Sequence, residues 1–380
     1  MIERASNPLP VIVYTLAKLD HGGAEMRSIQ LISHLRREHP TLTIVIHSTS
    51  TERGRLHDQF VEAGAIVVRG RPGIGGLPDF WRSCRRHRAT VAHVNHGMVS
   101  GYYLLMAFLA GVSQRFCHLR SDGEPRTTVV SRMIGLVGVS LVRIFCTRVV
   151  GVSAAARRVP RIPERSWRTI FNGVACDPPH IELGRRSEPR DGCRTLIVLG
   201  RMAPGKNCLR AVSIFEHLVA REGDRKLRLR FVGGGRAEDV CELERRVAAS
   251  PVASQIVMHG FTNEPLQALR DGVLLLFPSS SEGLPGVVLE ALSVGTPVVA
   301  SDIPAVREIA RRVTGIFVTP LAGPEEVWSD QIVIALREER AAGIIGSFRR
   351  GPFLLETYAA EMAALWSLPR AVGAPHGSSR

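Results

Sequence analysis

Two carboxylates eight positions apart bracket a glycine-rich turn in the second half of the chain. Glu282 lies in the turn at residues 278–286, and Glu290 lies on the segment that follows it. A carboxylate accepts hydrogen bonds from two vicinal hydroxyls, so the pair suits a ligand that carries several hydroxyl groups. Taken alone, such a pair is more often two solvated glutamates at an ordinary loop–helix junction.

The turn itself joins a predicted buried strand, residues 273–277, to a predicted helix. Gly283, Leu284 and Gly286 form it, and the helical spacing of apolar residues starts at Val287. The N-terminus of a helix has unpaired N–H groups and a partial positive charge. These four positions are therefore predicted to present backbone donors to an anionic or hydroxyl-rich ligand.

Two cations follow another predicted strand, residues 195–200, in the sequence GRMAPGKN. Arg201 and Lys206 on one loop, beside glycines, could hold a diphosphate. The loop does not match the G-x-x-x-x-G-K-[ST] pattern, because Asn207 replaces the hydroxyl residue, and it does not match G-x-G-x-x-G. Two solvated surface cations are the alternative. We favour the diphosphate because the loop is predicted at the same sheet edge as Glu282.

Further candidate residues follow strands of the first half. Gly22 and Gly23 stand between a strand and a helix, where they could hold a phosphate or merely serve the turn. Arg120 starts the polar segment 120–124 after the strand 116–119, where open α/β sheets place ligands, with a solvated loop as the alternative. His93 and His96 are a poor metal signal without further ligands, and we interpret them as structural. No metal site is predicted.

Both halves of the chain alternate short apolar strands with helical segments. In the first half the predicted strands are 11–16, 43–47, 65–68, 91–95, 116–119 and 149–153. The strand 149–153 is predicted to be the last one of this half. In the second half they are 195–200, 229–232, 256–258, 273–277, 298–300 and 316–318. The alternation predicts an α/β fold class with two doubly wound, Rossmann-like domains that face each other across a cleft.

The charge is concentrated in the first half. The 380 residues carry a formal charge of +14; residues 1–180 hold 24 Lys and Arg against 12 Asp and Glu, and residues 181–380 hold 25 against 23. This asymmetry points to an anionic partner for the first half. A nucleic acid is disfavoured, because no binding motif appears and aromatics do not interleave with the basic residues. The seven scattered cysteines and an N-terminal apolar run too short for a signal peptide predict a cytoplasmic protein.

Several motifs together resemble the retaining, nucleotide-sugar-dependent glycosyltransferases of glycosyltransferase family 4, which have the GT-B fold. They are HGGAE, VVGVS, FNGV, GRMAPGKN, FVGGG, HGF and FPSSSEGLPGVVLEALSVGTPVVASD. The resemblance covers nearly the whole chain. It implies an acceptor-binding domain 1–178, a nucleotide-sugar-binding domain 194–352 and a closing helix 353–370 that crosses back. Composition separately predicts a linker at 179–193, which is rich in Pro, Gly and charge, and a disordered tail at 371–380. The segment before the closing helix shows no regular pattern.

The resemblance also implies roles for the candidate residues. Glu282 would lie near the transferred sugar and Glu290 would hold the ribose hydroxyls. Arg201 and Lys206 would hold the diphosphate, and the Gly22 and Gly23 loop would close over the diphosphate or the acceptor. The family often has a histidine facing the sugar; here either His118 or Arg120 could take that role, and we favour Arg120.

The implied donor is a UDP- or GDP-sugar, and the implied reaction needs no cofactor. No Asp-x-Asp occurs in the sequence, which agrees with cations in place of a metal. The acceptor hydroxyl would attack from the face that the diphosphate leaves, so the anomeric configuration is retained. Another sugar-nucleotide enzyme of the same fold, such as an epimerase, is the alternative.

Two basic runs accompanied by tryptophan suggest where the excess charge is used. One combines Trp81 with Arg82, Arg85, Arg86 and Arg88, and the other combines Trp167 with Arg157, Arg158, Arg161, Arg165 and Arg168. Tryptophan beside arginine suits the headgroup level of an anionic membrane. We predict a peripheral protein on the inner face of the cell membrane that glycosylates a lipid-linked glycan, with arginines on a soluble enzyme as the alternative.

Overall fold

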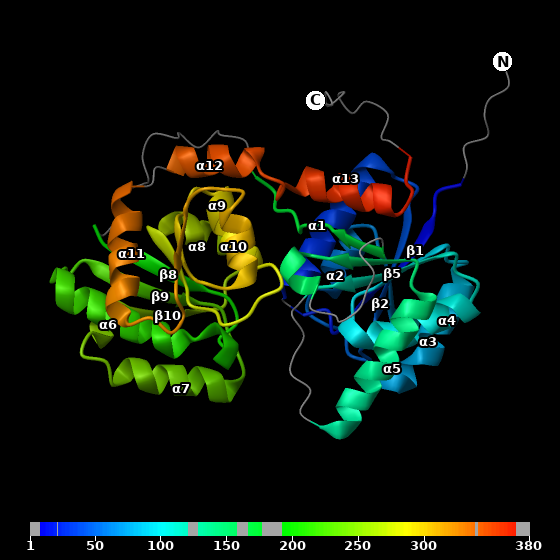
Figure 1. The fold of residues 1–380 in the computed structure, drawn as a ribbon, viewed down its shortest axis with the longest axis horizontal. Coiled ribbons are helices and arrows are strands. Elements are labelled where there is room, and N and C mark those ends of the chain that lie inside the picture. The colour runs from blue at the N-terminus through cyan, green and yellow to red at the C-terminus, as the bar shows by residue number, and fades with distance from the viewer. Residues whose placement is uncertain are drawn as a thin grey trace, which may run out of the picture. The chain divides into compact units, whose positions relative to one another are not determined.

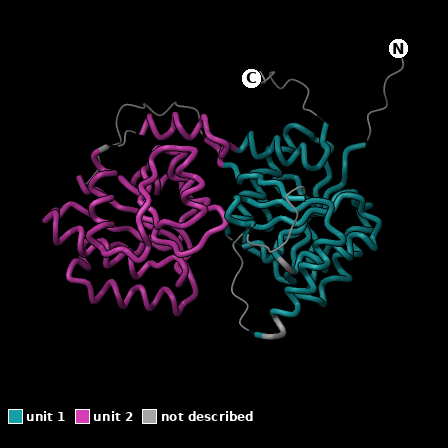
Figure 2. The backbone as a smooth tube through the Cα atoms, viewed as in Figure 1, with its two compact units in different colours: residues 1–173, 355–380 teal, residues 174–354 magenta. Residues whose placement is uncertain are grey.

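The computed structural model describes residues 8–20, 22–120, 128–157, 166–176, 192–338 and 341–369. The chain forms two compact units, residues 1–173 with 355–380 and residues 174–354 (Figure 2). We predicted the first boundary at residue 178 and the closing helix from residue 353. The predicted tail 371–380 and nearly all of the predicted linker 179–193 lie outside the described residues.

The first unit is built on a seven-stranded parallel sheet with strand order β3-β2-β1-β4-β5-β6-β7. Its strands are β1 Val11–Leu16, β2 Thr43–Ser48, β3 Ile66–Arg69, β4 Val91–Val94, β5 Gln114–Leu119, β6 Arg148–Gly151 and β7 Trp167–Thr169. The order reverses between β1 and β4, which both pair with neighbours in parallel register. Such a reversal is the switch point at which doubly wound sheets place ligands beyond the carboxyl ends of the strands.

Helices cover both faces of this sheet (Figure 1). They are α1 Gly23–Glu38, α2 His57–Glu62, α3 Leu77–Arg86, α4 Ser100–Leu109, α5 Val129–Phe145 and α13 Leu355–Leu365. The returning helix α13 packs on α1, and α4 packs between α3 and α5. The α4–α5 contact is close because Gly101 has no side chain: an added Cβ would lie 2.1 Å from the Gly138 carbonyl oxygen.

The second unit has a six-stranded parallel sheet with strand order β10-β9-β8-β11-β12-β13. Its strands are β8 Arg194–Leu199, β9 Leu227–Val232, β10 Ile256–Gly260, β11 Leu274–Phe277, β12 Val298–Ser301 and β13 Ile316–Thr319. Its helices are α6 Cys208–Glu222, α7 Ala237–Ala248, α8 Pro265–Asp271, α9 Gly286–Ser293, α10 Pro304–Ala310, α11 Glu325–Glu338 and α12 Ala341–Arg350. The order again reverses, here between β8 and β11.

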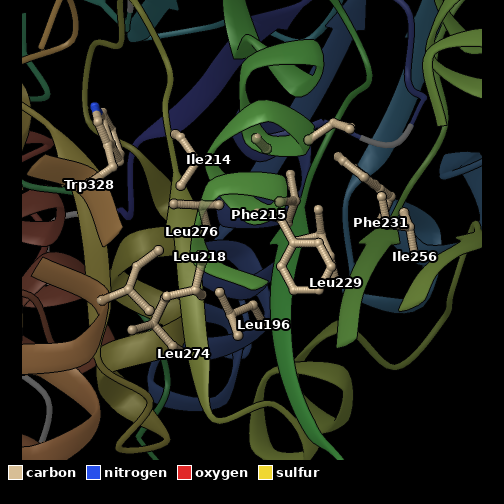
Figure 3. Close-up of a cluster of buried hydrophobic side chains, with 14 of the residues drawn as sticks. Leu196, Ile214, Phe215, Leu218, Leu229, Phe231, Ile256, Leu274, Leu276 and Trp328 are labelled. Carbon is tan, nitrogen blue, oxygen red and sulfur yellow. The ribbon is translucent and has the colours of Figure 1, made fainter. Parts of the chain in front are cut away.

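The core of the second unit forms where α6, α7 and α11 cover one face of the sheet. Side chains of β8, β9 and β11 meet the buried faces of these helices (Figure 3). Leu196 and Leu276 from adjacent strands, Phe215 from α6 and Trp328 from α11 are all fully buried. Burying a side chain of this size stabilises the fold by roughly 1.5–3 kcal/mol. The predicted class, two parallel-sheet α/β domains, is confirmed.

The first unit contains one strand more than we predicted. Residues 149–153 are predicted as the final strand, but β7 pairs in parallel with β6, with Trp167 opposite Val149 and Thr169 opposite Gly151. Trp167, which we predicted beside a basic run at a headgroup-level surface, is half-buried, and its indole N–H donates to Thr169 Oγ1 (3.0 Å). Its ring lies over Gly151, where an added Cβ would come within 2.3 Å.

The segment before the closing helix is also more regular than predicted. Residues 341–350 form α12, with Ile344 and Phe348 fully buried one turn apart. Gly343 and Gly346 dilute the helical spacing, because glycine is a poor helix former. Within the described part of the chain, no helix has both the length and the apolar character that crossing a membrane requires.

Candidate functional site

A pocket lies at the carboxyl ends of β8, β9 and β11 in the second unit. Its lining includes Gly200, Arg201, Lys206, Phe277 and Pro278. The two predicted cations are thus at one pocket, as the loop after β8 suggested. Arg201 is exposed, whereas Lys206 is half-buried with its ammonium 5.6 Å from the centre of the Phe277 ring.

Glycines allow the loops after β8 and β9 to run against each other beside this pocket. Gly200 and Gly233 both have positive φ, +141° and +131°, which side-chain-bearing residues rarely adopt. An added Cβ at Gly233 would lie 2.0 Å from the Gly200 carbonyl oxygen. Next along the loops, Met202 N–H donates to the Gly234 carbonyl at 2.8 Å. The motif FVGGG therefore fixes the backbone that carries Arg201.

An ion pair links the two conspicuous motifs of the second unit. Lys206 Nζ pairs with Glu282 Oε1, and the Ser279 hydroxyl donates to the same carboxylate oxygen (2.8 Å). Both charged side chains are mostly buried, at 28% and 16% exposure. Because both side chains are mostly buried, salt screens the attraction between these two charges less than it screens a surface ion pair. The structure thus joins Glu282 to the cationic loop.

The backbone reinforces this link between the loops. The Gly205 carbonyl accepts hydrogen bonds from Ser280 N–H (2.9 Å) and from the Ser280 hydroxyl (3.1 Å). Asn207 donates from Nδ2 to the Pro278 carbonyl (2.8 Å) and precedes α6 in the left-handed conformation, with φ +51°. Asparagine tolerates that conformation better than most residues. In the sequence Asn207 stands out only as a departure from the phosphate-loop pattern; in the structure its side chain links the two loops.

The turn after β11 places the remaining predicted residues of this unit at the start of α9. Gly283 and Leu284 are buried, Gly286 is the first residue of α9, and Val287 is half-buried behind it. Glu290 lies one turn further along the same helix and is half-buried. Among the described residues, no three His, Cys, Asp or Glu side chains gather as metal ligands.

In the first unit, the glycine pair forms the start of α1. Gly22 is the extended residue that caps the helix, and Gly23 is its first residue. The Glu25 carboxylate folds back over Gly22, where an added Cβ would lie 2.3 Å from Glu25 Oε2. Nothing lies within 4 Å of a Cβ added at Gly23. The two glycines therefore differ: a side chain at Gly22 would displace Glu25, and one at Gly23 would be accommodated.

A chain of hydrogen bonds fixes the proton positions on two buried histidines. The Trp366 indole N–H donates to His93 Nδ1 (3.3 Å), and His93 Nε2 lies 2.8 Å from His118 Nδ1. Burial holds the pKa of both histidines well below the usual value, so both are neutral. A neutral imidazole has one donor and one acceptor. Because indole only donates, His93 Nε2–H donates to His118, and the proton of His118 is on Nε2.

His118 and Arg120 both belong to the cluster around Tyr14 of β1. The Tyr14 ring stacks on His93, with ring centres 4.8 Å apart, and its hydroxyl accepts a hydrogen bond from Arg120 Nη2. Arg120 Nε donates to Asn95 Oδ1 (2.8 Å). His118 is fully buried and its Nε2 has no partner among the described residues. That either His118 or Arg120 faces the sugar, with Arg120 favoured, stays a prediction. The interpretation of His93 as structural agrees with the hydrogen bonds at both of its ring nitrogens.

The buried histidines of the first unit predict a loss of stability on acidification. Burial lowers the pKa of His47 to about 4, and it holds the pKa values of His93 and His118 well below the usual value. In the unfolded chain each titrates near ~6.5. Below that pH the unfolded state binds more protons, so the free energy of unfolding should fall as pH drops from about 7 towards 4. Each group contributes up to about 1.4 kcal/mol per pH unit.

Urea unfolding followed by tryptophan fluorescence at pH 7 and pH 5 measures this effect. The His47→Leu variant removes one titrating group and should show a shallower dependence on pH than the unmodified chain. Equal free energies of unfolding at the two pH values would contradict the neutral state of these histidines.

Comparison with known proteins agrees with the architecture of both units. Residues 193–337 match the family model described as glycosyl transferases group 1. The capsular polysaccharide biosynthesis glycosyltransferase CapH of Staphylococcus aureus is 25% identical over 298 residues, which span 77% of this chain and 81% of CapH.

Solved structures resemble almost the whole chain. HepE of Anabaena in complex with UDP-glucose superposes with a TM-score of 0.77 at 16% identity, covering 94% of this chain and 99% of HepE. The apo form of the lipopolysaccharide outer core galactosyltransferase WaaB has a TM-score of 0.67 at 15% identity, with coverage of 94% and 99%. The matched family segment contains the pocket, the Lys206–Glu282 pair and the turn before α9. The chain is therefore a glycosyltransferase with the GT-B fold, and its second unit carries the group 1 glycosyltransferase segment.

Proposed function

We propose that the chain transfers a sugar from a UDP- or GDP-sugar to a hydroxyl of a lipid-linked glycan, with retention of configuration, in the synthesis of a surface polysaccharide. The observation that carries the proposal is the Lys206–Glu282 pair, held beside Arg201 at the pocket. It combines cations for a diphosphate with a carboxylate for sugar hydroxyls. Two cations at the end of one strand favour an anionic ligand over a neutral one, because they can pair with phosphate oxygens.

In this proposal the cations stabilise the charge that develops on the leaving diphosphate. An ammonium has three N–H donors, so Lys206 can contact a phosphate oxygen while it remains paired with Glu282. Arg201 offers a planar set of donors that fits phosphate oxygens. Because the loop is fixed by Asn207 and Gly205, the charges are placed before the donor arrives, which is the condition for strong electrostatic stabilisation.

The proposed transfer balances without a side-chain nucleophile. The bond between the anomeric carbon and the phosphate oxygen breaks, and the acceptor oxygen bonds to the same face of that carbon. The acceptor proton passes to a phosphate oxygen of the leaving diphosphate. Glu290 holds the ribose hydroxyls, and His118 Nε2–H or Arg120 donates to a hydroxyl of the sugar.

The names of two similar proteins support the choice of donor and product. HepE was crystallised with UDP and with UDP-glucose, and CapH is named for capsular polysaccharide biosynthesis. We therefore place UDP-sugars first among the donors and a surface polysaccharide first among the products. The excess positive charge of the first unit supports a lipid-linked acceptor on the inner face of the membrane.

A panel of UDP-, GDP- and ADP-sugars tests the proposal. Thermal shift should single out one donor, and that donor should be hydrolysed slowly in the absence of acceptor, with the released sugar keeping its anomeric configuration. Conversion of the donor into an isomeric nucleotide sugar would instead identify an epimerase. No shift with any nucleotide sugar would contradict the proposal.

We also propose that the reaction needs no divalent metal. Activity with the best donor should survive EDTA, because Arg201 and Lys206 neutralise the diphosphate. The matched measurement adds magnesium after EDTA. If EDTA abolishes activity and magnesium restores it, the metal-free mechanism is wrong.

A further inference from the structure

Helix α5 turns an apolar face towards solvent. Met133, Leu136, Val137 and Ile144 are all exposed, and Leu136 and Ile144 are each 69% exposed. The other side of the helix is fixed on α4, where the Tyr102 hydroxyl donates to the Ile134 carbonyl (3.1 Å). Monomeric proteins rarely leave several large apolar side chains together on one helix face.

Two arginines lie along one edge of this face. Residues advance by about 100° around a helix, so Arg132 and Arg143, eleven positions apart, lie within about 20° of each other. Both are exposed. We call the set Arg132, Met133, Leu136, Val137, Arg143 and Ile144 the α5 face. Its arrangement, an apolar stripe with cations at its edge, is that of helices that lie in a membrane interface.

The apolar surface continues onto the end of α4. Phe108 and Leu109 are more than half exposed, and the Phe108 ring lies 5.2 Å from that of Phe145 at the end of α5. Arg115 lies over the Phe108 ring, 5.4 Å from its centre. The ends of the two helices therefore form one apolar surface, again with an arginine beside it.

The segment of the chain that contains this surface is positively charged. Residues 77–145, from the start of α3 to the end of α5, contain nine arginines and three acidic residues, Asp79, Asp122 and Glu124. Neither α4 nor α5 contains an acidic residue. On the neighbouring helix α3, Arg85 and Arg86 are exposed, whereas Arg82 is ion-paired with Asp79. The segment from α3 to α5 thus carries a net charge of +6, out of +14 for the whole chain.

We propose that the α5 face is the surface by which this protein docks on an anionic lipid bilayer. Leu136, Val137 and Ile144 enter the boundary between headgroups and acyl chains, and Arg132 and Arg143 contact lipid phosphates. Charge complementarity selects this occupant, since arginines flank the apolar stripe and acidic residues are missing from both helices. The inference deepens the proposed function, because a lipid-linked acceptor requires the enzyme at the membrane.

Vesicle sedimentation of the full chain, without donor or acceptor, tests the inference. The probes are vesicles of phosphatidylglycerol mixed with phosphatidylcholine and vesicles of phosphatidylcholine alone. The unmodified chain should bind the anionic vesicles, and part of the binding should persist at high salt because the apolar side chains are inserted. The Leu136→Ser/Val137→Ser variant should bind at least about tenfold more weakly. The Arg132→Ser/Arg143→Ser variant should lose roughly fivefold per arginine.

Val61→Ser is the matched control, because Val61 is an exposed apolar residue on α2 of the same unit. It should bind like the unmodified chain. Calorimetric titration with the best nucleotide sugar separates the two proposals: an intact donor affinity in the Leu136→Ser/Val137→Ser variant shows that the fold and the donor site survive. Failure of donor binding in the unmodified chain would contradict the proposed function and leave vesicle binding unaffected.

Three results would overturn the docking proposal. The first is equal vesicle binding by the Leu136→Ser/Val137→Ser variant and the unmodified chain. The second is equal binding to neutral and anionic vesicles, or binding to neither. The third is a dimer in gel filtration that the Leu136→Ser/Val137→Ser change converts to a monomer, which would make the face a contact between copies of the chain.

Discussion

Replacing Lys206 by alanine is expected to lower turnover by about a hundredfold or more, the usual cost of removing a preorganised charge that stabilises a leaving group. The loss has a second part in this protein. Glu282 is mostly buried and pairs with Lys206, so the substitution leaves its carboxylate without that partner. Initial rates with the best donor and acceptor measure the effect.

Further variants separate these two contributions. Arg201→Ala should lower turnover to a similar extent without disturbing Glu282. The Lys206→Ala/Glu282→Ala variant should be no worse than the product of the single losses, since the uncompensated carboxylate is gone. Arg225→Ala, an exposed arginine before β9, is the matched control and should be silent. If the turnover of Lys206→Ala stayed within a factor of about three of the unmodified chain, Lys206 would not stabilise the leaving group, because loss of a preorganised donor usually lowers turnover far more.

Replacing Glu290 by alanine is expected to weaken donor binding by roughly tenfold or more. Each hydrogen bond from a ribose hydroxyl to a carboxylate contributes roughly 1.5–3 kcal/mol. Unlike Lys206, Glu290 is proposed to hold the nucleoside in both ground and transition states. The Michaelis constant for the donor should therefore rise with little change in kcat.

Isothermal titration with the nucleotide sugar, and separately with the free nucleotide, measures the affinity directly. Both should weaken in parallel, because both carry the ribose. Glu244→Ala on α7 is the matched control, an exposed glutamate on another helix of the same unit. Unchanged affinity for the nucleotide in Glu290→Ala would refute the ribose assignment.

The regular elements of both units follow from local patterns, and the exceptions have physical reasons. Strand β1 has the bounds that its apolar run predicts. Strand β7 has only three residues, Trp167–Thr169, and all of them are half-buried, so no alternation or apolar run could reveal it. Helix α12 was missed because its two glycines interrupt the apolar spacing.

The site was partly predictable because its charged residues lie in recognisable loops. The sequence indicated Arg201, Lys206 and Glu282 as neighbours at one sheet edge, but it could not show that Lys206 and Glu282 pair across 76 positions. The contact between His93 and Trp366 spans 273 positions. No local sequence pattern predicts that His93 and Trp366 are in contact, because only the fold of the whole unit brings the end of α13 to β4.

The return of α13 to the first unit has a consequence for how this protein is made. Tyr358, Met362 and Trp366 on α13 are buried in the first unit, and apart from residues 355–380 this unit consists of residues that precede position 174. A ribosome therefore completes the second unit, residues 174–354, before it releases the last helix of the first. Until then the α1 side of the first unit exposes apolar surface that invites aggregation or chaperone binding. A chain that stalls or is truncated before residue 355 would therefore have a complete second unit, whereas its first unit would lack α13.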